Sequence, residues 1–168
     1  MNDLDRLAKD LLQHLRRRHL RLATAESCTG GLIAATLTEI AGSSDVVERG
    51  FVTYSNEAKA ELLGVPQAVL TEHGAVSEPV ARAMAEGALK ASPADLTIAV
   101  TGIAGPGGAT PTKPVGLVHL AVAGHGFETR HERHVFPGDR KEVRRATVER
   151  AFAMIRESSG QDPDDGEP

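Results

Sequence analysis

The sequence predicts a single α/β domain with a β-sheet between helices, and three observations support this prediction. Segments with helical and strand-like hydrophobic patterns follow one another from end to end, with no internal repeat or linker. The 168 residues are enough to bury a sizeable core in one domain. Hydrophobic residues make up 40% of the chain and aromatic residues 3%, so Leu, Val, Ile and Ala must form the core.

The first part of the chain predicts two helices and two strands. Leucines recur at helical spacing from Asp3 to His19, which predicts the first helix. The short apolar stretch 20–25 predicts a strand. A second helix is expected from Thr29 to Ile40, where A-G-S-S follows and ends it. The β-branched and aromatic residues of 50–55 predict the next strand.

Three short helices are predicted in the middle of the chain. Asn56 is expected to cap the first, and Gly64 ends it. The second runs from Pro66 to His73. Ser77 opens the third, which continues to about Ala91, because serine is a good N-cap and a proline two residues later is tolerated in a first turn.

Two buried strands are predicted at 95–101 and 115–123, joined by a loop rich in glycine and proline, 102–114. No helix separates these strands, so we expect a mixed sheet rather than a purely parallel one. A more exposed strand is predicted near 129–136.

Asp139 is expected to cap the last helix, which runs to about Ser158. The domain is therefore predicted to cover residues 1–158. Residues 159–168 form an acidic tail, which we expect to be disordered.

Composition argues against several classes of function. Lys and Arg number 19 and Asp and Glu 23, so the net charge is −4, whereas nucleic-acid binders usually carry a basic excess. We therefore expect no nucleic-acid partner. No apolar run is long enough to span a membrane, and the N-terminus lacks a signal-peptide core. We expect a cytoplasmic protein without membrane contact.

A metal site is not expected either. The chain has a single cysteine, Cys28, which excludes an intrachain disulfide and a cysteine-rich metal site. The seven histidines are scattered, without the ligand spacing that selects a metal.

The stretch T-A-E-S-C-T-G-G, 24–31, lies where a strand is predicted to end and a helix to begin. The first-turn N–H groups of a helix can stabilise an anion, and Gly30 and Gly31 would let a ligand approach the backbone. Ser27 is the candidate nucleophile, and Cys28 is a second candidate that we rank behind it. The alternative is that Ser27 or Thr29 only caps the helix and the glycines only pack.

Lys59 is the candidate general base for Ser27. As the third residue of a helix capped by Asn56, its charge would oppose the helix dipole, which favours the neutral amine. Tyr54, expected at the end of a strand, could orient a proton or stack on a ring. The alternatives are a solvated surface lysine and a tyrosine that packs in the core.

The loop T-G-I-A-G-P-G-G, 101–108, follows a buried strand and would expose several N–H groups to an anion. It matches neither the P-loop nor the dinucleotide-binding pattern. Arg140, at the start of the last helix, is well suited to hold a phosphate. The alternatives are a flexible surface loop and a solvated helix face.

Five stretches stand in order along the chain: T-A-E-S-C-T-G-G, G-F-V-T-Y-S-N-E-A-K, H-G-A-V-S, T-G-I-A-G-P-G-G…K-P-V-G and F-P-G-D-R. Together they resemble the CinA C-terminal domain family, in particular its stand-alone nicotinamide-nucleotide amidases (PncC). The resemblance covers about residues 5–157. One such stretch would be a weak signal, but five in order are specific.

The resemblance implies a reaction in which nicotinamide mononucleotide (NMN) and water give nicotinate mononucleotide and ammonia, in pyridine nucleotide salvage. It implies Ser27 as nucleophile and Lys59 as base, with Tyr54 assisting, and no metal or cofactor. It further implies a three-layer α/β/α domain with a mixed, mostly parallel sheet of about five strands, and homodimers.

Substrate contacts complete this hypothesis. Thr101 or Gly102 would help the first-turn N–H groups to hold the oxyanion, and Arg140 with the 102–108 loop would hold the phosphate. The residues expected to bind substrate are therefore Thr29, Gly30, Gly31, Thr101, Gly102, Gly105 and Arg140.

Two other functions remain open at this point. The chain could be a non-catalytic nucleotide-binding module, although such a module has no need of a Ser27–Lys59 pair. The family's link to competence and DNA damage suggests an interaction protein instead, against which the net charge and the scarcity of aromatic residues argue.

Overall fold

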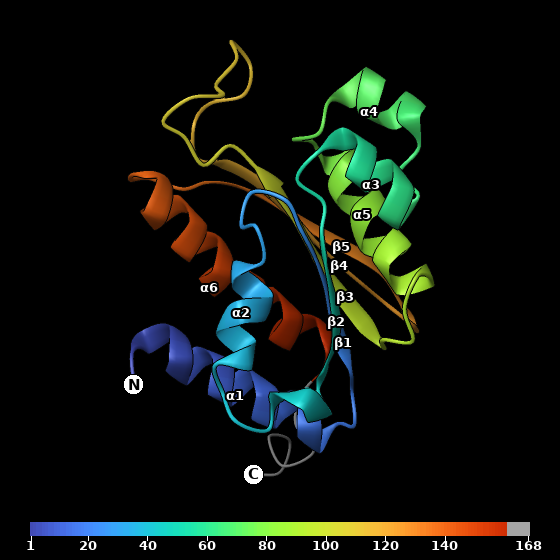
Figure 1. Ribbon diagram of the computed structural model, residues 1–168, viewed down its shortest axis with the longest axis vertical. Coiled ribbons are helices and arrows are strands. Elements are labelled where there is room, and N and C mark those ends of the chain that lie inside the picture. Colours follow the sequence, from blue (N-terminus) through green and yellow to red (C-terminus); the bar gives the residue numbers. More distant parts are fainter. Residues whose placement is uncertain (161–168) are drawn as a thin grey trace.

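The computed structural model describes residues 1–160. Its elements are α1 (Asp3–Arg17), β1 (Leu22–Glu26), α2 (Leu32–Thr38), the 3₁₀ turn η1 (Ser43–Asp45), β2 (Val47–Val52), α3 (Asn56–Leu63), α4 (Gln67–His73), α5 (Glu78–Lys90), β3 (Leu96–Gly102), β4 (Leu117–Gly124), β5 (Phe127–Val135) and α6 (Arg140–Ser158). Figure 1 shows three layers, with α1, α2 and α6 on one face of the sheet and α3, α4 and α5 on the other. The predicted α/β/α architecture is confirmed.

The sheet has five strands in the order β2-β1-β3-β4-β5. β1 pairs in parallel with β2 and β3, whereas β4 is antiparallel to both β3 and β5. The mixed sheet predicted from the missing crossover helix is therefore confirmed. β1, β2 and β3 end at the same edge, and the chain leaves β1 toward one face but returns from β2 to β3 over the other. Open α/β sheets bind ligands at such a switch point.

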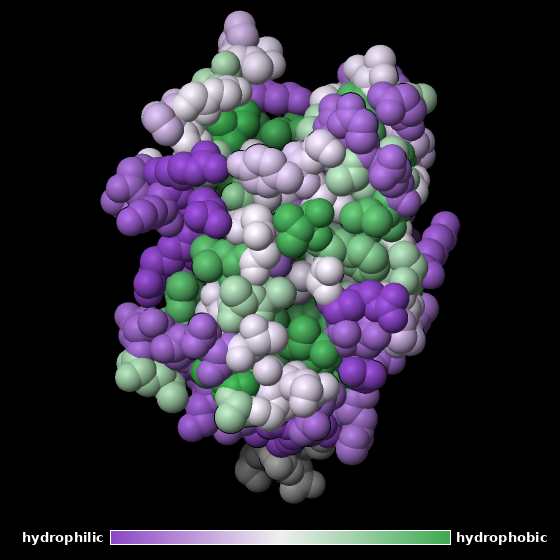
Figure 2. Space-filling view, viewed as in Figure 1, coloured by the Kyte–Doolittle hydropathy of each residue, from purple (hydrophilic) through white to green (hydrophobic). Residues whose placement is uncertain are grey.

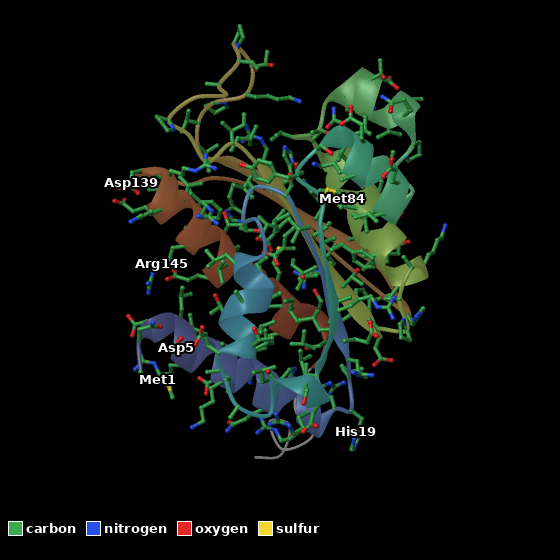
Figure 3. All side chains as sticks on the ribbon, viewed as in Figure 1. Met1, Asp5, His19, Met84, Asp139 and Arg145 are labelled. Atoms are coloured by element: carbon green, nitrogen blue, oxygen red, sulfur yellow. The ribbon has the colours of Figure 1, made fainter. Side chains whose placement is uncertain are left out.

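Two separate cores hold the layers together. One lies under α1, α2 and α6 and contains large aliphatic side chains such as Leu15, Ile98 and Ile155. The other lies under α5, where the sheet presents mainly alanines, so that this helix packs closely against it. Met84 of α5 lies between its helix and the sheet in Figure 3.

The surface reflects this layering. On the face shown in Figure 2, hydrophobic and neutral side chains gather in the centre, and hydrophilic side chains border them on both sides, over α1 and α6 and over α3 and α4. Asp139 and Arg145 of the α6 region project away from the sheet in Figure 3. None of the helices described is both long and apolar enough to cross a bilayer.

Most elements were predicted within a few residues, but two boundaries near the site were wrong. α2 begins at Leu32 rather than near Thr29, because Gly30 and Gly31 adopt positive φ values of 59° and 106° in a turn that precedes the helix. β2 ends at Val52 rather than at residue 55, because its partner β1 ends at Glu26, which pairs with Val52.

Two of the three predicted N-cap residues are confirmed, and one is wrong. Ser77 and Asp139 cap α5 and α6 as expected. Ser55, rather than Asn56, caps α3, and its hydroxyl accepts from the N–H of Ala58.

The domain boundary after residue 158 stays a prediction, although ordered contacts continue one residue further. Ser159 is the buried C-cap of α6, and its hydroxyl lies 2.8 Å from Nε2 of His14 in α1. Most of the predicted disordered tail, residues 161–168, lies outside the described residues.

Candidate active site

A pocket of about 270 Å³ lies at the edge where β1, β2 and β3 end. Its volume lies slightly below the range of typical small-molecule sites, which begins at about 300 Å³. The pocket brings together seven of the ten predicted site residues, from four parts of the sequence: Ser27, Tyr54, Lys59, Thr101, Gly102, Gly105 and Arg140. Thr29, Gly30 and Gly31 do not line it.

Ser27 follows directly on β1. Its N–H donates to Val100 O of β3 at 3.0 Å, so the backbone of this residue remains tied to the sheet. Side chains alternate along a strand, and Ser27 therefore projects to the same face as Ala25, the face that α5 covers. Only 9% of Ser27 is exposed.

Lys59 lies on the same face of the sheet and is almost completely buried, with 1% of its surface exposed. Its Nζ lies 3.0 Å from Ser27 Oγ and donates to Thr53 O at 2.7 Å. The N–H of Thr53 in turn donates to Glu26 O at 2.9 Å. The backbone of Thr53 therefore links the lysine to the residue before the serine.

Burial lowers the pKa of Lys59 from its ordinary value, because water no longer solvates the ammonium. The sequence suggested a different cause, the dipole of α3. With Ser55 as the cap, Lys59 is one position farther from the helix start than predicted. Within residues 1–160, both acceptors of Nζ are uncharged groups, so neither supplies a negative charge that would offset the burial. A neutral lysine 3.0 Å from a serine hydroxyl is suited to general-base chemistry.

Cys28 also lines the pocket, but its surroundings oppose its use as a nucleophile. The side chain is buried, and burial raises the pKa of the thiol to about 12, with a smaller contribution from the nearby Glu26 carboxylate. Reactive cysteines have a depressed pKa instead. This geometry favours Ser27.

The first-turn N–H groups of α2, expected to hold an oxyanion, are occupied. Those of Ile33 and Ala34 donate to the Glu26 carboxyl group at 2.7 and 3.1 Å. The Thr29 hydroxyl donates to the same group at 2.7 Å. Thr29 is fully buried and points away from the pocket into this cluster, which is why it does not line the pocket with Ser27.

Tyr54 and Arg140 form one wall of the pocket. Tyr54 is 62% exposed, and its hydroxyl accepts from Arg140 Nη2 at 3.0 Å. Arg140 Nη1 donates to Gly105 O at 2.9 Å. Arg140 therefore connects the segment after β2 to the loop after β3 through hydrogen bonds to two uncharged acceptors.

Two of the predicted site residues, Gly102 and Gly105, have no room for a side chain. A Cβ atom on Gly102 would lie 2.8 Å from Leu117 O, and one on Gly105 would lie 2.5 Å from Val115 Cγ1. The Thr101 hydroxyl donates to Ala75 O at 2.8 Å, which ties the stretch between α4 and α5 to the sheet.

Sequence reasoning missed several groups that shape the site. Asn56, expected only as a helix cap, lines the pocket, as do Ala75 and Val76. The H-G-A-V-S stretch was a signal for the last two, although its role was not predicted. No local signal identified the carbonyl of Thr53 or the carboxyl group of Glu26, because their partners lie on other elements.

Comparisons with known proteins identify a family and several relatives of this chain. The CinA C-terminal domain model matches residues 4–159. A "CinA-like protein" of Akkermansia muciniphila is 54% identical over 157 residues, which cover 94% of this chain and 38% of that protein. The "Nicotinamide-nucleotide amidohydrolase PncC" of Escherichia coli K12 is 52% identical over 153 residues, which cover 91% of this chain and 92% of that protein.

The length covered differs among these relatives. The chain spans 34 to 38% of the length of five relatives named CinA-like or putative competence-damage inducible proteins. Among solved structures, the "competence/damage inducible protein CihA" of Agrobacterium tumefaciens superposes with a TM-score of 0.92 at 49% identity, covering 96% of this chain and 98% of that one.

Proposed function

Because the chain belongs to the CinA C-terminal domain family, we propose that it is an amidohydrolase that converts NMN and water to nicotinate mononucleotide and ammonia, in pyridine nucleotide salvage. The observation that carries this proposal is the 3.0 Å contact between Lys59 Nζ and Ser27 Oγ in a pocket. The 52% identity with the amidohydrolase of E. coli, along most of both chains, supports the choice of substrate.

The first half of the proposed reaction forms an acyl-enzyme. Neutral Lys59 takes the proton from Ser27, and Ser27 Oγ attacks the carboxamide carbon of NMN. The resulting Lys59 ammonium returns its proton to the leaving nitrogen, and the C–N bond breaks to release ammonia. The lowered pKa of Lys59 supports both transfers, because the group must accept and donate a proton within one cycle.

The second half regenerates the enzyme. Lys59 takes a proton from water, the hydroxyl attacks the acyl carbon, and the bond to Ser27 Oγ breaks as Lys59 returns the proton to that oxygen. The products are nicotinate mononucleotide and free Ser27. Ser27 and Lys59 carry out every proton transfer and bond change together with substrate and water, so the proposal includes no metal and no cofactor.

Oxyanion stabilisation falls to backbone N–H groups other than those predicted, since Ile33 and Ala34 already donate to Glu26. Ala104 and Gly105 line the pocket, and within residues 1–160 their N–H groups have no hydrogen-bond acceptor. We assign the oxyanion to them. A crystal structure with a boronate bound covalently to Ser27 would locate this oxygen, and contacts to other donors would contradict the assignment.

Arg140 is assigned to the 5′-phosphate. Its two acceptors within the described part of the chain, Tyr54 Oη and Gly105 O, are uncharged, so they do not neutralise its positive charge. A phosphate contact that acts equally in the ground and transition states changes substrate binding alone. Arg140→Ala should therefore raise KM for NMN about 10-fold or more with little change in kcat. An unchanged KM would show that this role is wrong.

The experiment that tests the function is ammonia release from NMN in the presence of EDTA, by the wild type, Ser27→Ala and Cys28→Ala. We expect an active wild type, a loss of at least about 10³-fold in Ser27→Ala, and retained activity in Cys28→Ala. Loss of activity in Cys28→Ala, with inactivation by iodoacetamide, would favour a cysteine amidase. A wild type that binds NMN but releases no ammonia would favour a binding module.

A further inference from the structure

Glu26 is a buried carboxyl group that the proposed reaction does not use, although it directly precedes the nucleophile. It has no exposed surface. Because side chains alternate along β1, Glu26 projects to the face opposite to Ser27, toward α2 and α6. It does not contact the Ser27 hydroxyl, and its structural connection to Ser27 runs through the backbone and its own hydrogen bonds.

Those hydrogen bonds join both ends of the turn that contains the nucleophile. The carboxyl group accepts from the Thr29 hydroxyl at 2.7 Å and from the N–H groups of Ile33 and Ala34. The latter two belong to α2, whose N-cap, Gly31, has no side chain to offer. Glu26 thus serves as a remote cap for this helix and fixes where the turn 27–31 ends.

Thr29 is the centre of this turn and is held on both sides. Its hydroxyl donates to Glu26, while its carbonyl accepts from Arg144 Nη2 of α6 at 2.9 Å. Within the turn, the N–H of Gly30 donates to Ser27 O at 3.0 Å. A shift of Thr29 is therefore passed directly to the backbone of Ser27.

The geometry points to a positioning role: we propose that Glu26 and Thr29 hold the turn 27–31 so that Ser27 Oγ remains within reach of Lys59 Nζ. This inference rests on the proposed function. The two residues do not touch substrate, so they should affect kcat rather than KM. A displacement of about 1 Å in a reacting group can reduce a rate about 100-fold.

Thr29→Val tests the proposal with a near-isosteric change, and Thr29→Ser keeps the hydroxyl. We expect kcat for NMN to fall 10- to 100-fold in Thr29→Val with KM within about twofold of the wild type. Thr29→Ser should recover most of the rate. Glu26→Gln should behave like Thr29→Val, because its NH₂ group would face an N–H donor of α2.

A matched variant separates positioning from general stability. Thr97 is a second buried threonine, whose hydroxyl donates to Ala85 O at 2.7 Å near the start of β3, away from the pocket. Thr97→Val should lower Tm comparably but leave kcat unchanged at a temperature well below Tm. If Thr29→Val lowered Tm alone, as Thr97→Val is expected to, the positioning role would be wrong.

The rate at which a fluorophosphonate labels Ser27 in the same variants reads the nucleophile without NMN. A slower rate in Thr29→Val, restored in Thr29→Ser, is expected whatever the natural substrate. If the wild type were labelled but released no ammonia, the proposed substrate would fail and the positioning role would stand. Equal labelling of the wild type and Thr29→Val would overturn the positioning role.

Discussion

The pocket and the surface between β5 and α6 differ in how they surround a positively charged side chain. On that surface, Arg150 donates to both oxygens of Glu132 at 2.7 Å and also contacts Glu157. These contacts raise the pKa of Arg150 and, led by the Arg150 hydrogen bonds, lower that of Glu132 to about 2. In the pocket, Lys59 is more deeply buried, yet its partners among residues 1–160 are a hydroxyl and a carbonyl, and burial lowers its pKa.

The difference shows what each region is built to do. A carboxylate partner stabilises a cation and keeps it charged, which suits a structural contact between β5 and α6. A buried lysine with only neutral partners destabilises the fold but is readily deprotonated. The chain forms ion pairs between β5 and α6, but no ion pair is described at Lys59 within residues 1–160, where the proposed reaction requires a base.

Removing Lys59 should have the largest effect. Lys59→Met should lower kcat for NMN at least about 10³-fold, and Lys59→Arg should be equally inactive because a guanidinium does not give up its proton. Since only neutral Lys59 accepts a proton, wild-type kcat should rise with pH up to the lowered pKa and level off above it. Steady-state assays from pH 5 to 10 measure this rise of kcat with pH. A profile that is flat throughout, or an active Lys59→Arg, would exclude Lys59 as the base.

Giving the lysine a counter-charge should have an intermediate effect and make the two regions alike. Cys28 is electrostatically coupled to Lys59. Cys28→Asp would place a carboxylate there, raise the pKa of Lys59 and move the acid limb of the kcat profile to higher pH. We expect kcat at pH 7 to be about 10-fold lower than in Cys28→Asn, the matched neutral variant. Identical pH profiles in these two variants would show that charge near Lys59 does not control the rate.

Breaking the ion pairs of the other region should have the smallest effect, on stability alone. Glu132→Gln should lower the free energy of unfolding by about 1 to 2 kcal/mol at pH 7 and leave kcat unchanged. Because the folded pKa of Glu132 is depressed, its contribution is present above about pH 4.5 and is lost as pH falls toward 2. Urea titrations at pH 7 and pH 3 should therefore differ more for the wild type than for the variant. An equal pH dependence would contradict the assignment.

Much of the architecture follows from local patterns. Apolar spacing, cap residues and β-branched content together identified every helix and strand between residues 1 and 160, although they did not identify η1. Ser77 and Asp139 were recognised as caps from their chemistry and their neighbours. The absence of a helix between β3 and β4 was enough to predict a mixed sheet. Ser27, Lys59 and Arg140 were recognised as candidates because Ser27 directly follows β1, whereas Lys59 and Arg140 lie in the first turns of α3 and α6. The homodimer and the cytoplasmic location stay predictions.

Tertiary structure decided how those residues work. Spacing along the chain cannot measure the 3.0 Å between groups 32 residues apart, nor the burial that lowers the pKa of Lys59. It also cannot reveal that Glu26 occupies the N–H groups of α2 and removes Thr29 from the pocket. Local sequence determines where most helices begin and end, since their hydrogen bonds are short-range. Burial, distance and charge at the site depend on which distant elements pack together.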